Sequence, residues 1–139
     1  MERFPPDNLF MLPTSKPERI GLILLSAFFI VGGVLHFVFP AAYAGIMPPW
    51  LPWHAELVVI SGVCEIAGGV GVLLPRTRHV AGWGLILLSL AVLPANAQML
   101  LDYHAAQAPL WQQALLALRL PLQLPLIWWI WRVTRTPKS

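Results

Sequence analysis

Four long stretches of this chain are made mostly of apolar residues, and proline-rich, polar or basic segments separate them. Each stretch is close to the ~20 residues that an α-helix needs to cross the hydrocarbon core of a bilayer. Because the connections between them are short, neighbouring spans are expected to run antiparallel. The pattern predicts an all-α membrane protein, a four-transmembrane-helix up-down bundle with spans at residues 18–39, 55–74, 80–101 and 110–131.

The connection between the first two spans, residues 40–54, has the sequence PAAYAGIMPPWLPWH. Its four prolines favour an irregular loop rather than a helix. Tyr43, Trp50 and Trp53 are aromatic residues of the kind enriched at the boundary between membrane and water. We therefore expect a Pro/Trp-rich interfacial loop here, with Trp50 and Trp53 lying as a lid over the outer end of the bundle.

Composition agrees with this membrane assignment, and charge sets the orientation. Hydrophobic residues make up 58% of the chain and charged residues 11%, against about 25% charged in soluble domains. The two connections 40–54 and 102–109 contain no Lys or Arg. By the positive-inside rule both termini are expected to be cytoplasmic. The basic residues at the ends of the spans or beyond them are Arg3, Lys16, Arg19, Arg76, Arg78, Arg132, Arg135 and Lys138.

These observations give an expected domain organisation. Residues 1–17 are a cytoplasmic tail, residues 18–131 are the transmembrane domain, and residues 132–139 are a basic cytoplasmic tail. We expect a multi-pass protein of a bacterial inner membrane, with the lipid bilayer as its first partner. The formal charge of +3 comes from residues beside the spans, so no nucleic-acid partner is expected.

One polar residue interrupts each apolar stretch: His36, Glu65, Asn96 and Arg119. A charged side chain at the centre of a membrane helix costs roughly 2.5–3.5 kcal/mol on insertion scales, and such residues usually mark a functional site. Counting the rise per residue, Glu65 and Arg119 lie about 14–15 Å below the outer ends of their spans, and the other two lie about 5–8 Å deep. All four are therefore expected to line one cavity that opens outward.

Span 4 adds a further candidate. Gln123 follows Arg119 by four residues, so the two share a helix face. Pro121 and Pro125 flank Gln123 and leave carbonyl oxygens without their usual helical donors. A structural alternative stays open, in which Glu65 and Arg119 form an ion pair and the other polar residues only hold helices together. The candidate ligand-binding residues are His36, Glu65, Asn96, Arg119, Gln123 and Trp50.

The sequence gives little support for a disulfide, a metal site or a known catalytic motif. Cys64 is the single cysteine of the chain, which excludes an intrachain disulfide and a dithiol pair. His54, Glu56, Asp102 and His104 lie near the outer ends of the spans, but their spacing is not typical of a metal site, and none is expected. No phosphate-binding loop, dinucleotide fingerprint or hydrolase motif is present. We expect no intrinsic cofactor and assign no catalytic residue, and whether the protein is an enzyme stays open.

Several short elements resemble the DoxX-like family of small four-helix integral membrane proteins. They are GVLHF at 33–37, MPPWLP at 47–52, GVCEIAGG at 62–69 and PAN at 94–96, and the resemblance covers about residues 20–100. It implies a four-helix bundle, with His36, Glu65 and Asn96 on motif positions. Some members of that family are subunits or accessories of quinone-linked redox systems, and others are chaperone-like.

Three functions follow as hypotheses. The first is a pocket that binds a lipophilic small molecule with a polar head, such as a quinone or a lipid, with another membrane or redox subunit as partner. In it Arg119 and His36 donate hydrogen bonds, Glu65 orients Arg119 or exchanges a proton, and Asn96 completes the head-group contacts. The second is a non-catalytic accessory subunit or assembly factor. The third is half of a transporter, completed as a homodimer.

Overall fold

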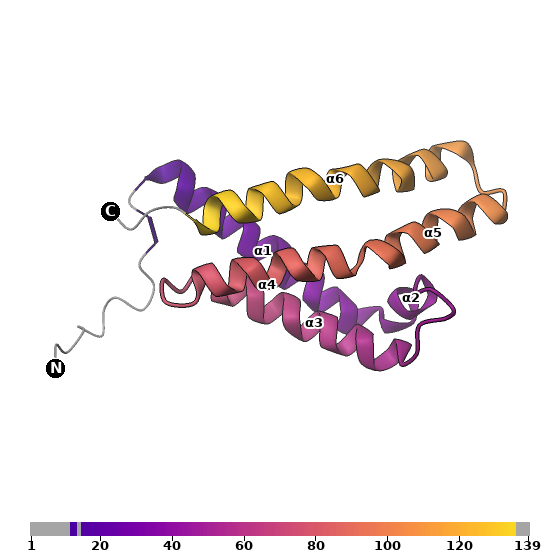
Figure 1. The fold of residues 1–139 in the computed structure, drawn as a ribbon, viewed down its shortest axis with the longest axis horizontal. Coiled ribbons are helices and arrows are strands. Elements are labelled where there is room, and N and C mark those ends of the chain that lie inside the picture. Colours follow the sequence, from indigo (N-terminus) through magenta and orange to yellow (C-terminus); the bar gives the residue numbers. More distant parts are fainter. Residues whose placement is uncertain (1–11, 14, 136–139) are drawn as a thin grey trace.

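The computed structural model describes residues 12–13 and 15–135, and their regular structure is entirely helical (Figure 1). Four helices are long and apolar enough to cross a membrane, counting α4 and α5 together as one span over Arg78–Ala105. The expected all-α bundle with four spans is confirmed. The helices are α1 Lys16–Val38, α2 Pro40–Gly45, α3 His54–Gly71, α4 Arg78–Ala91, α5 Leu93–Ala105 and α6 Leu110–Thr134.

The long helices run up and down, so that the start of α1, the α3–α4 connection and the end of α6 lie at one end of the bundle (Figure 1). The cations at this end are Lys16, Arg19, Arg76, Arg78, Arg132 and Arg135, so Arg119 is the only Lys or Arg placed elsewhere among the described residues. This gathering is the one that the positive-inside rule requires. Arg3 and Lys138 lie outside the described residues, and the cytoplasmic placement of this end stays a prediction.

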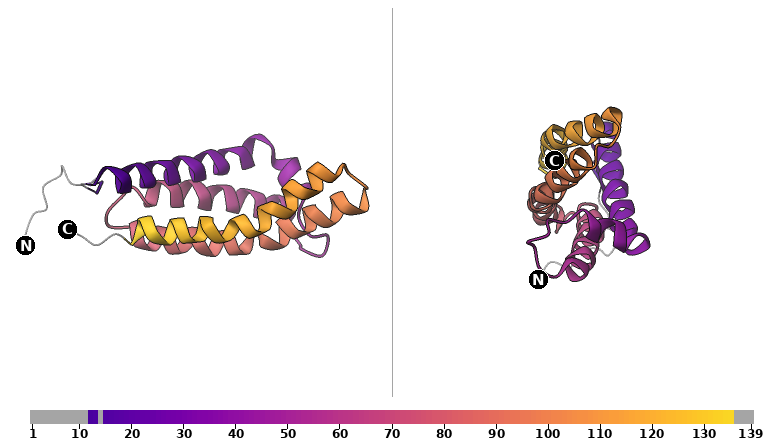
Figure 2. Two further views of the ribbon diagram at one scale, coloured as in Figure 1. Left: turned by 90° about the horizontal axis from the view of Figure 1, so that it is seen from above. Right: turned by 90° about the vertical axis from the view of Figure 1, so that its right-hand side faces the viewer.

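The third span is interrupted, unlike the continuous helix that its apolar pattern suggested. α4 ends at Ala91, and α5 begins at Leu93 with Pro94 in its first turn. Proline has no N–H to donate to the carbonyl four residues earlier, and its ring clashes with that carbonyl. The break therefore falls where the sequence places proline, and it directs α5 alongside the first half of α6 (Figure 2).

The connection 40–54 is less irregular than we expected. Residues Pro40–Gly45 form the short helix α2, and the prediction that this segment contains no helix is wrong. Pro40 occupies the first turn, where the missing N–H would have no helical partner anyway and the fixed φ suits a helix. The remaining prolines fall in the stretch between α2 and α3, which is not helical.

Helices α1 and α3 pack closely because both contribute glycine at their crossing. A Cβ at Gly33 would lie 2.7 Å from the backbone oxygen of Gly62, so neither position has room for a side chain. Such small residues let membrane helices approach closely. The apolar core lies at the basic end, where α1, α4 and α6 meet; it comprises Leu22, Leu25, Phe29, Val72, Leu85, Ile86, Ile130 and Val133.

Candidate functional site

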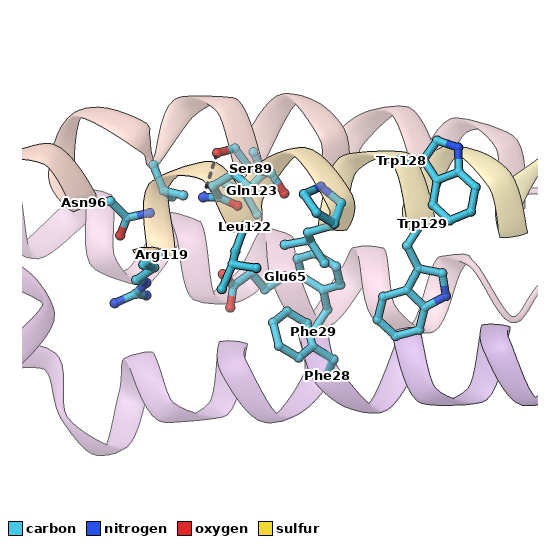
Figure 3. Close-up of a pocket in the computed structure, with 14 residues that line it drawn as sticks. Phe28, Phe29, Glu65, Ser89, Asn96, Arg119, Leu122, Gln123, Trp128 and Trp129 are labelled. Atoms are coloured by element: carbon cyan, nitrogen blue, oxygen red, sulfur yellow. Dashed lines mark hydrogen bonds between the residues drawn. The ribbon is translucent and has the colours of Figure 1, made fainter. Parts of the chain in front are cut away.

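A cavity of about 590 Å³ lies between α1, α3, α4, α5 and α6 (Figure 3). Five polar residues contribute to its wall: Glu65, Ser89, Asn96, Arg119 and Gln123. Four of the predicted site residues therefore meet in one space. The rest of the wall is apolar and strongly aromatic, and it includes Phe28, Phe29, Leu122, Leu126, Trp128 and Trp129.

A second cavity of about 520 Å³ adjoins the first and reaches α2. His36 and Tyr43 line this second cavity, so His36 does not line the same cavity as Asn96 and Gln123. Glu65 and Arg119 line both cavities. The two charged side chains therefore lie at the boundary between the two spaces, where a bound molecule in either would meet them.

His36 and Glu65 are the paired titratable groups of the site. The His36 Nδ1 atom lies 3.5 Å from a carboxylate oxygen of Glu65. The same Nδ1 lies 2.9 Å from the backbone oxygen of Gly32, and because a carbonyl oxygen can only accept, Nδ1 carries a proton. Gly32 also makes room for the carboxylate, because a Cβ there would lie 3.0 Å from the Glu65 Oε2 atom.

Tyr43 of α2 completes this side of the site. Its ring stacks on the imidazole of His36, with centroids 3.9 Å apart and an interplanar angle of 25°. Burial raises the pKa of the Tyr43 hydroxyl, the charge of Glu65 raises it further, and the charge of Arg119 lowers it. Sequence reasoning missed Tyr43 as a site residue because it placed this residue in an irregular loop.

Arg119 is the cation of the site; it lines both cavities and is an exposed residue. Within the described part of the chain, Glu65 makes its ion-pair contact with His36, and Arg119 has no carboxylate partner. The predicted structural ion pair between Glu65 and Arg119 is therefore not formed. Glu65 meets His36 because α1, which carries His36, packs directly against α3. The cavity separates α6, which carries Arg119, from α3.

Asn96 and Gln123 are both buried. Gln123 donates from Nε2 to the backbone oxygen of Ser89 over a long distance of 3.4 Å. Among the described residues, the Asn96 amide forms no side-chain hydrogen bond. Asn96 and Arg119 lie toward the same end of the cavity in the view of Figure 3, and both line its wall.

Trp50 does not belong to this site. It is 74% exposed, Trp53 is 73% exposed, and neither lines either of the two cavities. Trp50 is thus separate from both cavity walls, and its role as a ligand-binding lid stays a prediction. The aromatic walls come instead from Phe28, Phe29, Trp128 and Trp129 of α1 and α6. The sequence did not single out these four residues as site residues, because aromatic residues in a membrane helix usually face lipid.

The cavity opens to the side of the bundle. Its wall includes Phe28 of α1, which is 55% exposed, and Leu122 and Trp128 of α6, which are 53% and 57% exposed. Exposed wall residues on two neighbouring helices mean that the space between these helices is not closed. The cavity therefore reaches the side of the bundle, which faces the bilayer when α1 and α6 cross it, and the expected outward opening stays a prediction.

Two histidines at the end of the bundle opposite the cations have partners nearby in the chain. His54 contacts the backbone oxygen of Pro48 at 3.1 Å, and His104 contacts Oε1 of Gln113 at 2.9 Å. Within residues 12–13 and 15–135, no group of three or more His, Cys, Asp or Glu side chains is arranged to hold a metal ion. The single cysteine, Cys64, is free and exposed.

Fold and site together define a multi-pass α-helical membrane protein with a polar cavity inside its helical bundle. The chain belongs to the family described as "Domain of unknown function (DUF8561)", which matches residues 25–134. No curated protein and no solved structure matches it. The match covers all four long helices from the middle of α1 onward, and therefore includes every residue of the site.

Proposed function

We propose that this protein binds a lipophilic small molecule with a polar head, such as a quinone, and serves a redox-associated membrane system. One observation carries the proposal: a cavity at membrane depth joins a cluster of polar side chains to aromatic walls and opens sideways. Its volume of about 590 Å³ falls within the roughly 300–1,000 Å³ of typical small-molecule sites. A molecule dissolved in the bilayer can enter such a site without crossing water.

The two parts of the wall suit two parts of one ligand. Phe28, Phe29 and Trp129 offer flat apolar surfaces for a ring or a hydrocarbon tail, and burying such surface contributes about 25 cal/mol per Å². Arg119 and Asn96 bring N–H donors that are not used by the described residues. They would hold the oxygen atoms of a head group, while the tail lies along the aromatic wall.

The His36–Glu65 pair gives the site a proton to exchange. The pair lies beside the cavities and connects through the stacked Tyr43 ring to α2, at the end of the bundle opposite the cations. A quinone head takes up protons when it is reduced, and the electrons would come from a partner subunit that carries a redox cofactor. The redox role is part of this proposal, and the resemblance to DoxX-like proteins supports it.

The test pairs ligand content with stability. The protein is purified in detergent, extracted with organic solvent and analysed by mass spectrometry, and its melting temperature is measured in parallel. We expect a stoichiometric lipophilic molecule in the wild type, and its loss in Asn96→Ala with little change in melting temperature. Gln98→Ala, on the same helix but outside both cavities, is the matched control and should retain the molecule.

A different result selects the alternative hypothesis. If Asn96→Ala lowers the melting temperature and the content of co-purified molecules is unchanged, the polar residues only support the bundle. The protein would then be an accessory subunit or assembly factor rather than a binding protein.

A further inference from the structure

The cation of the cavity, Arg119, has no carboxylate group of the described chain in contact with it. Arg119 carries a positive charge at every pH that a protein experiences. Glu65 is the one carboxylic acid among the described residues that line the two cavities, and it is in contact with His36.

Glu65 is not placed to pair with Arg119, because its carboxylate group contacts His36. The Glu65 Oε2 atom is buried and has no hydrogen-bond partner in the described chain. An unpaired ion in a low-dielectric site is unfavourable. Arg119 therefore brings to the cavity a positive charge that no carboxylate of the described chain contacts.

We infer that the preferred ligand of this site is an amphiphile whose head is an oxyanion, a carboxylate or a phosphate, bound by Arg119 and Asn96. This inference rests on the proposed function and specifies the chemistry of its ligand. An oxyanion would supply the counter-charge that the protein does not provide. Arginine suits it because the planar guanidinium can donate two parallel hydrogen bonds to a carboxylate or a phosphate.

The walls argue for an amphiphile rather than a small inorganic anion. Beside Arg119 the cavity is bordered by Phe28, Leu122 and Trp129, and it reaches the side of the bundle. A free anion would leave this apolar surface uncovered and would have to cross hydrocarbon to reach it. A tail attached to the oxyanion covers the surface and brings the head from the bilayer.

The test compares two probes with the same tail. The protein is reconstituted in lipid nanodiscs, and binding of radiolabelled stearic acid and of its methyl ester is measured at a pH at which the acid is ionised. Empty nanodiscs correct for partition into lipid. We expect the acid to bind about tenfold more tightly than the ester, as charge-assisted hydrogen bonds exceed neutral ones. A neutral quinone with an alkyl tail is measured in the same way.

Three variants locate the preference. Arg119→Gln should abolish the difference between acid and ester, and Arg119→Lys should retain part of it. Arg135→Gln is the matched control, because Arg135 stacks on Trp83 and Trp131 at the end of the bundle and lines neither cavity; it should leave the difference unchanged. Excess inorganic phosphate should not displace the acid, and displacement would show that the site takes free anions.

Each outcome decides the question. If wild-type protein binds acid and ester equally, or if the preference persists in Arg119→Gln, the inference is wrong. If the neutral quinone then binds and the acid has no advantage, the proposed function stands without the inference. If no probe binds above the empty nanodiscs, the proposed function fails as well. The wild-type comparison needs no variant, so poor folding of Arg119→Gln would not leave the inference undecided.

Discussion

The two neighbours of α1 contrast sharply. Against α3, α1 is held by close contact at glycine and by a 2.6 Å hydrogen bond from the Ser26 hydroxyl to the backbone oxygen of Gly69. On the α6 side, two cavities separate the helices over much of their length, and the cation Arg119 is left without a carboxylate partner among the described residues. Small residues close one interface, and large aromatic residues line the cavity at the other.

The difference shows how a short membrane protein can combine a rigid scaffold with a binding site. The α1–α3 pair is stabilised by close backbone contacts that leave no room for an added side-chain atom. The α6 side gives up packing and retains polar groups that a bound molecule can satisfy. The predictions below test this contrast, beginning with the largest effect.

Adding a side chain to the closed interface should be the most damaging change. In Gly33→Leu the new Cβ would lie 2.7 Å from the Gly62 oxygen and 2.7 Å from a side-chain carbon of Ile66, so the helices must separate. We expect the free energy of unfolding to fall by about 3 kcal/mol. Gly84→Leu is the control, because nothing lies within 4 Å of its added Cβ. Equal stability of the two variants in detergent would show that α1 and α3 do not pack as described.

Double-mutant cycles should find Glu65 coupled to α1 and not to α6. We expect an interaction energy of roughly 1–2 kcal/mol between His36→Ala and Glu65→Gln, as found for residues in contact. The corresponding cycle for Arg119→Leu and Glu65→Gln should give less than about 0.5 kcal/mol. The measurement is the unfolding free energy of the single and double variants. A larger interaction energy for Arg119 and Glu65 than for His36 and Glu65 would support an ion pair between Glu65 and Arg119.

The two buried hydrogen bonds between helices should differ in strength. Ser26→Ala removes the short bond between α1 and α3 and should cost about 1 kcal/mol. Gln123→Leu removes the 3.4 Å bond to Ser89, which is near the limit for a hydrogen bond, and should cost less than about 0.5 kcal/mol. Melting temperatures of the two variants decide the comparison, and a larger loss for Gln123→Leu would mean that the bond between α6 and α4 is the stronger of the two.

The smallest effect is on the ionisation of Tyr43, which reports the charges at the cavity boundary. Its pKa is raised by burial and by Glu65 and is lowered by Arg119. Glu65→Gln should therefore lower the pKa of Tyr43, and Arg119→Leu should raise it. Ultraviolet titration of tyrosinate measures both in a Tyr103→Phe background, because the chain has two tyrosines. Shifts of opposite sign to these would contradict the arrangement of charges in the site.

The fold could be predicted well because it depends on features that can be counted along the chain. Span lengths, short connections and flanking cations fix the number and direction of the helices. The same pattern placed Glu65, Asn96, Arg119 and Gln123 at depths at which they can meet, and they do line one cavity.

The partners within the site could not be predicted in this way. Whether Glu65 faces α1 or α6 depends on helix rotation and on glycine contacts between segments far apart in sequence. The pairing of His36 with Glu65 thus required the packed structure. The role of Tyr43 depended on whether a proline-rich segment forms a helical turn, and the exposure of Trp50 depended on the path of the loop.

A crystal structure of the protein grown in a lipidic mesophase tests the central claim most directly. The account predicts elongated non-protein density in the cavity, with its head at Arg119 and Asn96 and its tail along Phe28 and Trp129. Density for ordered water alone, or α6 packed against α1 with the cavity closed, would contradict it.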